Sequence, residues 1–434
     1  MNRFDLKEGF LIGTASAATQ IEGGTLEHSW MDWYHKGHIA DGSSPARTNE
    51  HYLRWQEDDA LMRDLGFQVA RIGVEWARVE PRLGTFDEDA IAHYVAEVEL
   101  LLTYGIKPLV TLHHFTNPMW FEELGAFENV ENLPHFLRFV ERMVTAFGAR
   151  VTEYITINEP NVYAVNGYYS GLWPPGVKSF GRTVRVMSVL TAAHMLAYER
   201  IHALQAEMGI TETRVSYANH MRAFAPQNPG NPLHRLYAKL SERFFQGALS
   251  KTMGTGRFGF PIRNLIGMKP GLYCDFIALN YYTRSTVKNL GDGVRGNAPV
   301  NDLGWEIYPQ GIVECAQALY HIHPLPIYVT ENGTCDNTDA FRCRYLYEHL
   351  KAISESTLPF QRYYHWCFID NFEWLEGESA RFGVVHVDYE TQVRTVKQSG
   401  RFIAAVINEG GVNDALYTQY VAPQQYRTNA KEDG

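Results

Sequence analysis

Short apolar runs alternate with segments of helical periodicity from one end of the 434-residue chain to the other. Between Asp87 and Gly105, apolar side chains recur every third or fourth residue, which predicts an amphipathic helix with Asp87 as its N-cap and Gly105 as its stop. A second stripe over Phe136–Phe147 predicts another helix, which ends at Gly148. Each stripe is followed by a short β-rich run, so the pattern indicates repeated steps from helix to strand.

Eight β-rich runs of this kind occur along the chain, and helix-like segments separate them. Strands that alternate with helices form parallel βα units, and eight such units predict an α/β fold with one closed (β/α)8 TIM barrel. The predicted strands are Leu11–Ala15, Val69–Val74, Pro108–Leu112, Glu153–Ile157, Arg214–Ala218, Phe276–Leu279, Ile327–Val329 and Tyr364–Phe368.

The spacing of these runs predicts long βα loops. From Gly13 to Cys367 the seven intervals average about 51 residues, whereas a minimal barrel uses roughly 31 per unit. No Ser/Gly-rich linker or low-complexity tract divides the sequence, so we expect residues 1–434 to form a single catalytic barrel domain. A doubly wound open sheet is the competing architecture, and it is disfavoured because no GxGxxG turn follows the first strand.

Composition and charge exclude several classes of partner. The net charge is −10, and no long run of Lys and Arg provides a footprint for nucleic acid or an anionic membrane. No window approaches 18 consecutive apolar residues, so no membrane span is expected. Phe10–Ala18 superficially mimics a signal peptide, but it is short and follows a mixed-charge segment, so we interpret it as the first buried strand and expect a cytoplasmic protein.

The cysteine pattern and the histidine pairs predict neither disulfides nor a metal site. The five cysteines are odd in number and show no zinc-ligand spacing, which is typical of buried, reduced thiols. The His321/His323 pair has no carboxylate or cysteine nearby in the sequence, and His113 is interpreted as a core residue. We therefore expect no metal and no cofactor, and homo-oligomerisation cannot be read from the sequence.

Two glutamates stand where predicted strands end. Glu159 follows the fourth strand in TINEP, and Glu331 follows the seventh in VTENG. In a barrel these positions face one cavity, and paired carboxyl groups there fit glycoside hydrolysis, in which one is protonated and the other ionised. A separation of ~5–5.5 Å gives retention and ~6.5–9.5 Å gives inversion, so the residues alone leave both outcomes open. For either glutamate taken singly, a salt bridge or a helix cap is the commoner role.

The two motifs make the chain resemble glycoside hydrolase family 1, the family of β-glucosidases and β-galactosidases, from about Phe10 to about Phe402. TINEP is similar to the acid/base motif of that family, and VTENG to its nucleophile motif. The resemblance implies that Glu159 is the general acid/base and Glu331 the covalent nucleophile. It also implies a retaining mechanism, for which we expect Glu159 to have a raised pKa in the free enzyme.

Further segments resemble sugar-binding motifs of the family. FLIGTASAATQIEG implies that Gln20 binds hydroxyls of the cleaved sugar, and TLHHF assigns a sugar-binding role to His114, followed by Phe115 where the family usually has Trp. RIGVEW implies that Arg71 lies beside the nucleophile and keeps it ionised. Asn158 is expected to bind the sugar 2-hydroxyl, a contact that strengthens in the transition state.

The remaining implied site residues come from the last third of the chain. LNYY matches the family at Asn280 and at Tyr282, whose hydroxyl is expected to donate to the nucleophile, and DLGWEIYP places Trp305 under the leaving group. Taken alone, such aromatic and amide side chains are more often packing residues or polar ends of a barrel. Their joint position at predicted strand ends within one family pattern favours the functional interpretation.

The segment HWCFIDNFEWLEGESARFG resembles the strand-eight loop of the family. It implies that Trp366 lies under the sugar ring, that an ionised Glu373 and Trp374 bind its distal hydroxyls, and that Phe382 closes the wall. A carboxylate there would repel a phosphate, which disfavours 6-phospho-sugars. Glu378 departs from the family pattern, which commonly has an aromatic residue, and its role is open.

The sequence therefore predicts a retaining enzyme that hydrolyses a small-molecule β-glycoside and releases glucose, with galactose or fucose as alternatives in the same family. A 6-phospho-β-glycosidase and a sugar-binding protein that has lost catalysis are less favoured alternatives. An unrelated barrel enzyme, such as an aldolase, would need a Schiff-base lysine or a Gly-rich phosphate loop near strands seven and eight, and neither is present. We expect the loops Asn161–Pro175 and Phe224–Pro232 to shape the aglycone side.

Overall fold

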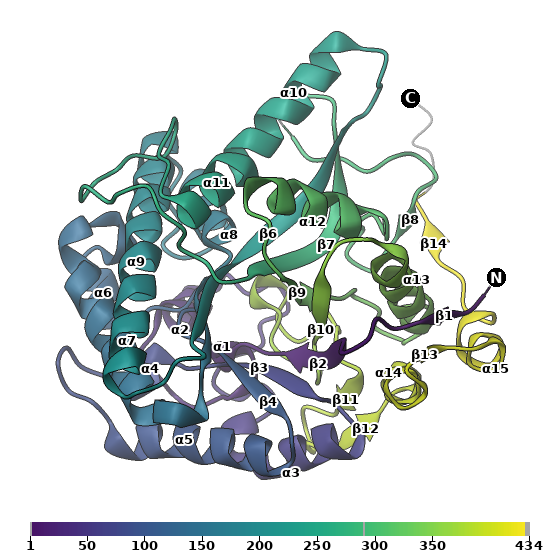
Figure 1. Cartoon of the computed structure of the whole chain (residues 1–434), viewed down its shortest axis with the longest axis horizontal. Helices are drawn as coiled ribbons and strands as arrows, with labels where there is room; N and C mark the ends of the chain where they lie inside the picture. The colour runs from purple at the N-terminus through teal and green to yellow at the C-terminus, as the bar shows by residue number, and fades with distance from the viewer. Residues whose placement is uncertain (1, 290, 430–434) are drawn as a thin grey trace.

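The computed structural model describes residues 2–289 and 291–429, and eight parallel strands in it close into a barrel (Figure 1). Neighbours around the barrel are β10, β2, β3, β4, β5, β6, β7 and β9. This confirms the predicted (β/α)8 architecture with long βα loops. The strands are β2 (Leu11–Ala15), β3 (Val69–Gly73), β4 (Lys107–Thr111), β5 (Glu153–Asn158), β6 (Arg214–Pro226), β7 (Ile277–Val287), β9 (Ile327–Asn332) and β10 (Phe360–Trp366).

Each predicted run overlaps one barrel strand, but two strands are much longer than predicted. β6 and β7 continue past Ala218 and Leu279, and they stay paired as far as Pro226 and Val287. The extension carries polar and charged side chains, so the pattern of apolar runs did not predict it. Backbone pairing between the two strands holds it together beyond the barrel mouth, where Figure 1 shows it extending toward α10 (Pro232–Glu242).

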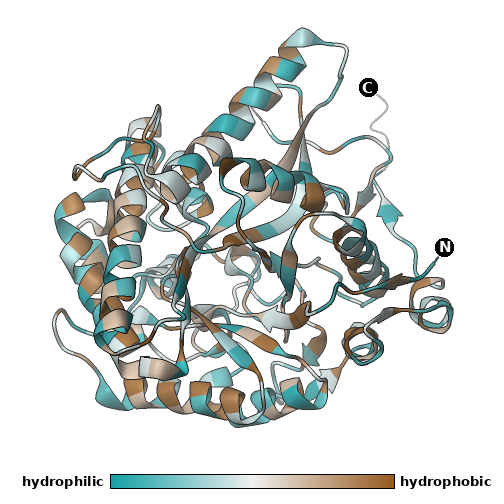
Figure 2. Cartoon of the chain, in the orientation of Figure 1, coloured by the Kyte–Doolittle hydropathy of each residue, from teal (hydrophilic) through white to brown (hydrophobic). Residues whose placement is uncertain are grey.

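The helices surround the barrel (Figure 2), and α5 and α7 bury mostly apolar side chains. The predicted helix limits are confirmed: the Asp87 side chain accepts from the backbone N–H of Ala90 at 2.9 Å, and Gly148 ends α7 with a φ of +53°. Within the part of the chain that the structure covers, no helix is both long and apolar enough to span a bilayer. The longer helices are α3 (His51–Asp64), α5 (Glu88–Thr103), α7 (Leu133–Phe147), α9 (Phe180–Glu207), α11 (Ala248–Thr255), α12 (Gly311–Ile322), α13 (Arg342–Glu355) and α14 (Gln398–Glu409).

Shorter elements lie in the loops and near the chain ends. They include π-helical turns after α8 and α10, and three two-stranded antiparallel sheets. These elements are α1 (Ala18–Ile21), α2 (Ser29–His35), α4 (Trp76–Val79), α6 (Met119–Glu123), α8 (Pro160–Ala164), η4 (Val165–Ser170), η5 (Arg243–Gly247) and α15 (Asp414–Leu416), with strands β1 (Phe4–Asp5), β8 (Pro299–Val300), β11 (Val385–Val387), β12 (Arg394–Val396), β13 (Gly411–Val412) and β14 (Arg427–Thr428).

A buried ion pair joins strands at the amino-terminal end of the barrel. The Arg362 guanidinium on β10 binds the Glu153 carboxylate on β5, with one contact at 2.8 Å, and Lys107 on β4 donates to the same carboxylate at 2.8 Å. Because these cations favour the ionised form, the pKa of Glu153 is lowered although burial by itself would raise it. The pair closes the amino-terminal end of the barrel, opposite the carboxyl ends of the strands.

The first strand approaches its neighbour so closely that it needs a glycine. A Cβ atom at Gly13 would lie 1.8 Å from the Val69 carbonyl oxygen. Since that oxygen belongs to the backbone of β3, it cannot rotate away, and a larger residue would have to push the two strands apart. The small residue therefore sets the spacing of the barrel at this point.

We predict that Gly13→Ala lowers the free energy of unfolding by at least about 1–3 kcal/mol, the usual cost of overpacking. The measurement is thermal unfolding followed by circular dichroism. Gly181→Ala is the matched control, because nothing lies within 4 Å of the added methyl group at that position. Equal melting temperatures for the two variants would contradict the prediction.

Candidate active site

A cavity opens at the carboxyl ends of the barrel strands, with an empty volume of about 990 Å³ including its open mouth. Side chains from β6, β7, β9 and β10 line it, together with side chains from the segments that follow β4, β5, β7 and β10. Ten of the fourteen site residues predicted from the sequence are in this lining: His114, Phe115, Glu159, Tyr282, Trp305, Glu331, Trp366, Glu373, Trp374 and Phe382. The other four, Gln20, Arg71, Asn158 and Asn280, are buried directly behind it and bond to lining residues.

Glu331 lies near the end of β9 and is held from two sides. One carboxylate oxygen forms an ion pair with the Arg71 guanidinium, and the other accepts from the Tyr282 hydroxyl at 2.5 Å. Only 3% of Glu331 is exposed. Both predicted neighbours of this carboxylate are therefore present, and together they fix its orientation.

Arg71 connects four strands of the barrel. Its Nε donates to the Thr111 hydroxyl at 2.9 Å, and its Nη2 donates to the Asn158 side-chain oxygen at 2.7 Å. Its Nη1 donates to the Glu331 carboxylate and, at 3.3 Å, to the Thr330 carbonyl oxygen. These groups belong to β4, β5 and β9, while Arg71 itself is on β3. Each of the three guanidinium nitrogens thus has an acceptor in the protein.

Glu159 is the first residue after β5, and its backbone lies in the left-handed region with a φ of +43°. Non-glycine residues held there are strained, and such residues cluster at functional sites. One carboxylate oxygen accepts from the Asn280 amide at 2.8 Å and contacts Nδ1 of His220 at 3.0 Å. Two side chains therefore direct the Glu159 carboxyl group into the cavity.

The two buried carboxyl groups influence each other's titration. Burial raises the pKa of Glu331 to about 7, and the charge of Glu159 adds to this effect, while Arg71 and Tyr282 oppose it. Burial also favours the neutral form of Glu159, but His220 in its cationic form, Asn280 and Arg71 lower the pKa of that group. The prediction of a raised Glu159 pKa in the free enzyme is therefore wrong, because the sequence interpretation did not include His220.

His114 and Gln20 present free polar atoms. The Asn158 amide donates to Nε2 of His114 at 2.9 Å, so the proton of the neutral imidazole lies on Nδ1. Burial lowers the pKa of His114 well below its usual range, and Arg71 adds to the shift. The Nδ1 atom of His114 and the Oε1 atom of Gln20 are buried without a partner among the described residues. One donor and one acceptor are thus available to a ligand.

Glu373 lies in the same part of the cavity, and its carboxyl group differs from the prediction. The Gln20 amide donates to its Oε2 atom at 3.2 Å, and the Trp366 indole does so at 3.4 Å. Burial raises the pKa of Glu373 to about 8, and the charges of Glu331 and Glu159 add to it. The group is therefore protonated at neutral pH instead of ionised, and it can both donate and accept a hydrogen bond.

Aromatic rings form the walls on either side of these polar groups. The rings of Trp366 and Trp374 each stack on His114, at centroid distances of 5.8 and 5.9 Å. Phe382 lies 6.0 Å from Trp305 across the opening. Trp374 and Phe115 both have positive φ angles, as Glu159 does. Two of the wall rings therefore belong to residues with a strained backbone conformation.

The sequence interpretation missed two residues that line the cavity, His220 and Trp173. His220 lines the cavity on the extension of β6, beyond the predicted end of that strand at Ala218, and Trp173 packs against Phe115 at 4.8 Å. A polar residue just beyond a predicted strand end is the signal that could have identified His220. Trp173 lies in the predicted loop Asn161–Pro175.

The two loops expected to shape the aglycone side contribute unequally. Asn161–Pro175 supplies lining residues but is largely helical, through α8 and η4. Phe224–Pro232 supplies no residue to the lining and begins within β6, so that expectation is wrong. Glu378 is not in the lining either, and its backbone N–H donates to Asp41 and Ser43.

The cavity itself holds no cluster suited to a metal. Across residues 2–289 and 291–429, one group of three neighbouring metal-ligating side chains was found, His51, Asp59 and Glu97, and none of the three lines the cavity. The chemistry available in the cavity is therefore that of its carboxyl groups, amides and aromatic rings.

Comparison with known proteins agrees with this chemistry. The family model described as glycosyl hydrolase family 1 matches residues 2–412. Beta-glucosidase A of Thermotoga maritima is 31% identical over 95% of this chain and all of that protein. A beta-galactosidase of Pyrococcus woesei is 27% identical over 94% of this chain and 98% of its own length.

Solved structures show the same similarity in three dimensions. A beta-glycosidase from Pyrococcus horikoshii superposes with a TM-score of 0.87 at 30% identity, covering 96% of this chain and 98% of that one. The Thermotoga maritima beta-glucosidase in complex with glucoimidazole gives a TM-score of 0.85 at 29% identity, covering 94% of this chain and all of that one.

We predict that His220→Asn raises the pKa of Glu159. The imidazole lowers that pKa through its charge and its hydrogen bond, and asparagine can keep a hydrogen bond but carries no charge. The measurement is a carboxyl ¹³C NMR titration of glutamate-labelled protein, in which Glu159→Gln identifies the signal. A Glu159 pKa that is equal in wild type and His220→Asn would contradict the prediction.

Proposed function

The chain belongs to glycosyl hydrolase family 1 and is a β-glycosidase, and we propose that it is a retaining β-glucosidase with Glu331 as the nucleophile and Glu159 as the acid/base. The observation that carries the proposal is the placement of both carboxyl groups in one buried cavity, each fixed by its own partners. The ion pair with Arg71 and the hydroxyl of Tyr282 favour the ionised form that a nucleophile needs.

The reaction proposed here has two steps. In the first, the proton shared by the coupled pair must lie on Glu159, so that the Glu331 carboxylate attacks the anomeric carbon while Glu159 protonates the leaving oxygen. In the second, Glu159 accepts a proton from a water molecule, whose oxygen bonds to the anomeric carbon and displaces Glu331 as a carboxylate. Once Glu331 is an ester it carries no charge, so its effect on the Glu159 pKa disappears and the proton can leave more readily. His220, which contacts Glu159 at 3.0 Å, is placed to stabilise the ionised form of the base.

Glucose is the sugar we propose for the cavity. The free Nδ1–H of His114 and the free Oε1 of Gln20 supply a donor and an acceptor for ring hydroxyls. A protonated Glu373 supplies one of each, and Trp366 offers an aromatic face to the ring. We propose that Asn158, whose amide already binds His114, contacts the 2-hydroxyl. Galactose and fucose differ from glucose at the distal positions, so they are the alternatives.

A 6-phospho-sugar fits this cavity less well. The side chains near the distal end include Glu373 and Glu376, and the lining contains no lysine. A phosphate would meet carboxyl groups instead of cations, which is unfavourable. We therefore propose an unphosphorylated substrate. The catalytically inactive alternative is disfavoured because both carboxyl groups keep their supporting side chains.

We also propose that the whole chain acts as a single catalytic domain, and that it acts in the cytoplasm. All five cysteines are buried and unpaired, which suits a reducing compartment. The aglycone would lie toward Trp173 and Trp305, since these side chains line the outer part of the cavity. Its identity is a question for substrate screening.

We predict that wild type hydrolyses aryl β-D-glucoside faster than the β-D-galactoside or the 6-phospho-β-D-glucoside, and that Glu331→Gln is inactive on all three. The amide cannot attack the anomeric carbon, so kcat should fall by several orders of magnitude. ¹H NMR of the first product should show the β-anomer. An α-anomer as first product would refute retention, and residual activity in Glu331→Gln near the wild-type level would refute the nucleophile assignment.

A separate prediction concerns Glu159. A dinitrophenyl leaving group needs no protonation, whereas an alkyl leaving group does, so Glu159→Gln should slow glycosylation by about 10²–10⁴-fold with an alkyl glucoside and far less with the dinitrophenyl glucoside. The measurement is kcat/KM for both substrates. Glu376→Gln is the matched control on another carboxyl group of the cavity. Equal losses on the two substrates would contradict the acid role.

A further inference from the structure

Helix α3 turns a charged face toward the interior of the protein. Its four buried residues are His51, Asp58, Asp59 and Met62, of which three have ionisable side chains. Asp58 and Asp59 follow His51 by about two helical turns, so the three residues lie on one side of the helix. That side packs against α5, where Glu97 is also buried. Buried charges are costly unless an opposite charge or a metal ion compensates them.

Three of these four ionisable groups have partners. Arg394 on β12 binds the Asp58 carboxylate through two nitrogens, at 2.9 and 3.2 Å. The same carboxylate contacts Nδ1 of His51 at 2.9 Å. On the other side of the imidazole, Nε2 lies 3.2 Å from an oxygen of Glu97. A continuous chain of contacts thus runs from Arg394 through Asp58 and His51 to Glu97.

Asp59 is the exception. Its side chain is fully buried, and neither carboxylate oxygen has a hydrogen-bond partner. It does not point away from the chain of contacts: one ligand atom each from His51, Asp59 and Glu97 lie within 4.8 Å of one another. An unpartnered carboxylate at this depth, aimed at a histidine and a second carboxylate, is the arrangement expected of an incomplete coordination sphere.

We propose that His51, Asp59 and Glu97 bind one divalent transition-metal ion, through Nε2 of the imidazole and an oxygen of each carboxylate. Zn²⁺ binds nitrogen and oxygen ligands at about 2.0–2.2 Å, so its ligand atoms lie about 3.3–4.4 Å from one another. From separations of at most 4.8 Å, the three side chains need to close by up to about 1.5 Å to reach that geometry. Nitrogen and oxygen ligands without sulfur suit Zn²⁺ or Mn²⁺.

The surroundings of this α3 site are those of a metal centre. A metal-bound histidine usually donates its other ring N–H to a carboxylate, which fixes the ring and raises its basicity. Asp58 supplies that carboxylate to His51, and Arg394 holds Asp58 in place. Metal ligands bind in their deprotonated forms, and with Asp58, Asp59 and Glu97 ionised, His51 neutral and Arg394 charged, the formal charge of the group is −3 + 1 = −2. A divalent cation neutralises it.

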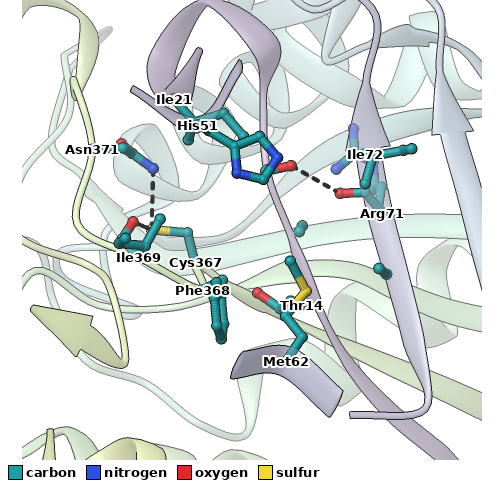
Figure 3. A pocket seen from close by; sticks show the side chains of 13 residues that line it. Thr14, Ile21, His51, Met62, Arg71, Ile72, Cys367, Phe368, Ile369 and Asn371 are labelled. Atoms are coloured by element: carbon teal, nitrogen blue, oxygen red, sulfur yellow. Dashed lines mark hydrogen bonds between the residues drawn. The ribbon is translucent and has the colours of Figure 1, made fainter. Parts of the chain in front are cut away.

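Space for a further ligand adjoins the histidine. His51 borders a small cavity between β2, β3 and the segment that follows β10, where Cys367 and Phe368 form part of the wall (Figure 3). The cavity is large enough for a water molecule. The α3 site lies among the outer helices, and none of its three ligands lines the catalytic cavity, so the ion holds α3 to α5 and takes no part in the glycosidase reaction.

The test compares metal retention by four proteins. Wild type, Asp59→Asn, Glu97→Gln and the control Asp64→Asn are stripped with a chelator, loaded with ZnCl₂ or MnCl₂, desalted and assayed by plasma mass spectrometry. Asp64 ends the same helix but has a 59% exposed side chain, so its substitution leaves the site intact. We expect one retained equivalent in wild type and in Asp64→Asn, and an affinity at least tenfold lower in the two ligand variants.

Two further readouts separate a specific site from surface binding by other histidines. Added Zn²⁺ should raise the melting temperature of wild type by several degrees and that of Asp59→Asn by none. Asp58→Asn should weaken binding about 10–100-fold, as expected for a residue that orients a ligand. Hydrolysis of aryl β-D-glucoside, assayed on each variant, reports that the barrel is folded.

Retention of less than a tenth of an equivalent by wild type would overturn the proposal, as would equal retention by wild type and Asp59→Asn. If Asp59→Asn does not fold, the visible absorption spectrum of Co²⁺-loaded wild type tests the proposal instead. Bands typical of nitrogen and oxygen ligation at one equivalent support the site, and the spectrum of free aqueous Co²⁺ refutes it.

Discussion

The buried guanidinium of Arg71 is the interaction on which the catalytic mouth of the barrel depends. Arginine stays charged in the protein interior, so each of its N–H groups needs an acceptor. It finds them on β4, β5 and β9, in Thr111, Asn158 and Glu331. Because these groups come from different strands, one side chain sets the relative position of a large part of the site. Removal of Arg71 would leave a buried carboxylate without its counter-charge.

The protonation of the site follows from how each carboxyl group is enclosed. Glu331 and Glu373 are buried near other acidic groups, which raises the pKa of both. Glu159 is equally buried, but a histidine beside it reverses the direction. Three glutamates in one cavity therefore have three different tendencies to ionise, and none of the differences comes from the glutamate itself.

The same rule of compensated charge applies outside the cavity. Glu153 is matched by Arg362 and Lys107 at the closed end of the barrel, and Asp58 is matched by Arg394 among the outer helices. Asp59 is fully buried and lacks such a match. Glu159, Glu331 and Glu373 each have at least one hydrogen-bond partner, so the exception at Asp59 motivates the metal site inferred beside α3.

The sequence by itself determined the barrel, its strands and the positions of Glu159 and Glu331, because apolar periodicity and motifs at strand ends are local properties of the chain. It also identified ten of the nineteen residues of the lining, through resemblance to a family. Only the tertiary structure decided that β6 continues to His220, that this histidine touches Glu159, and that Phe224–Pro232 lies outside the cavity. The pKa of Glu159 and of Glu373 could not be predicted, since both depend on groups distant in sequence that barrel closure brings within a few ångströms.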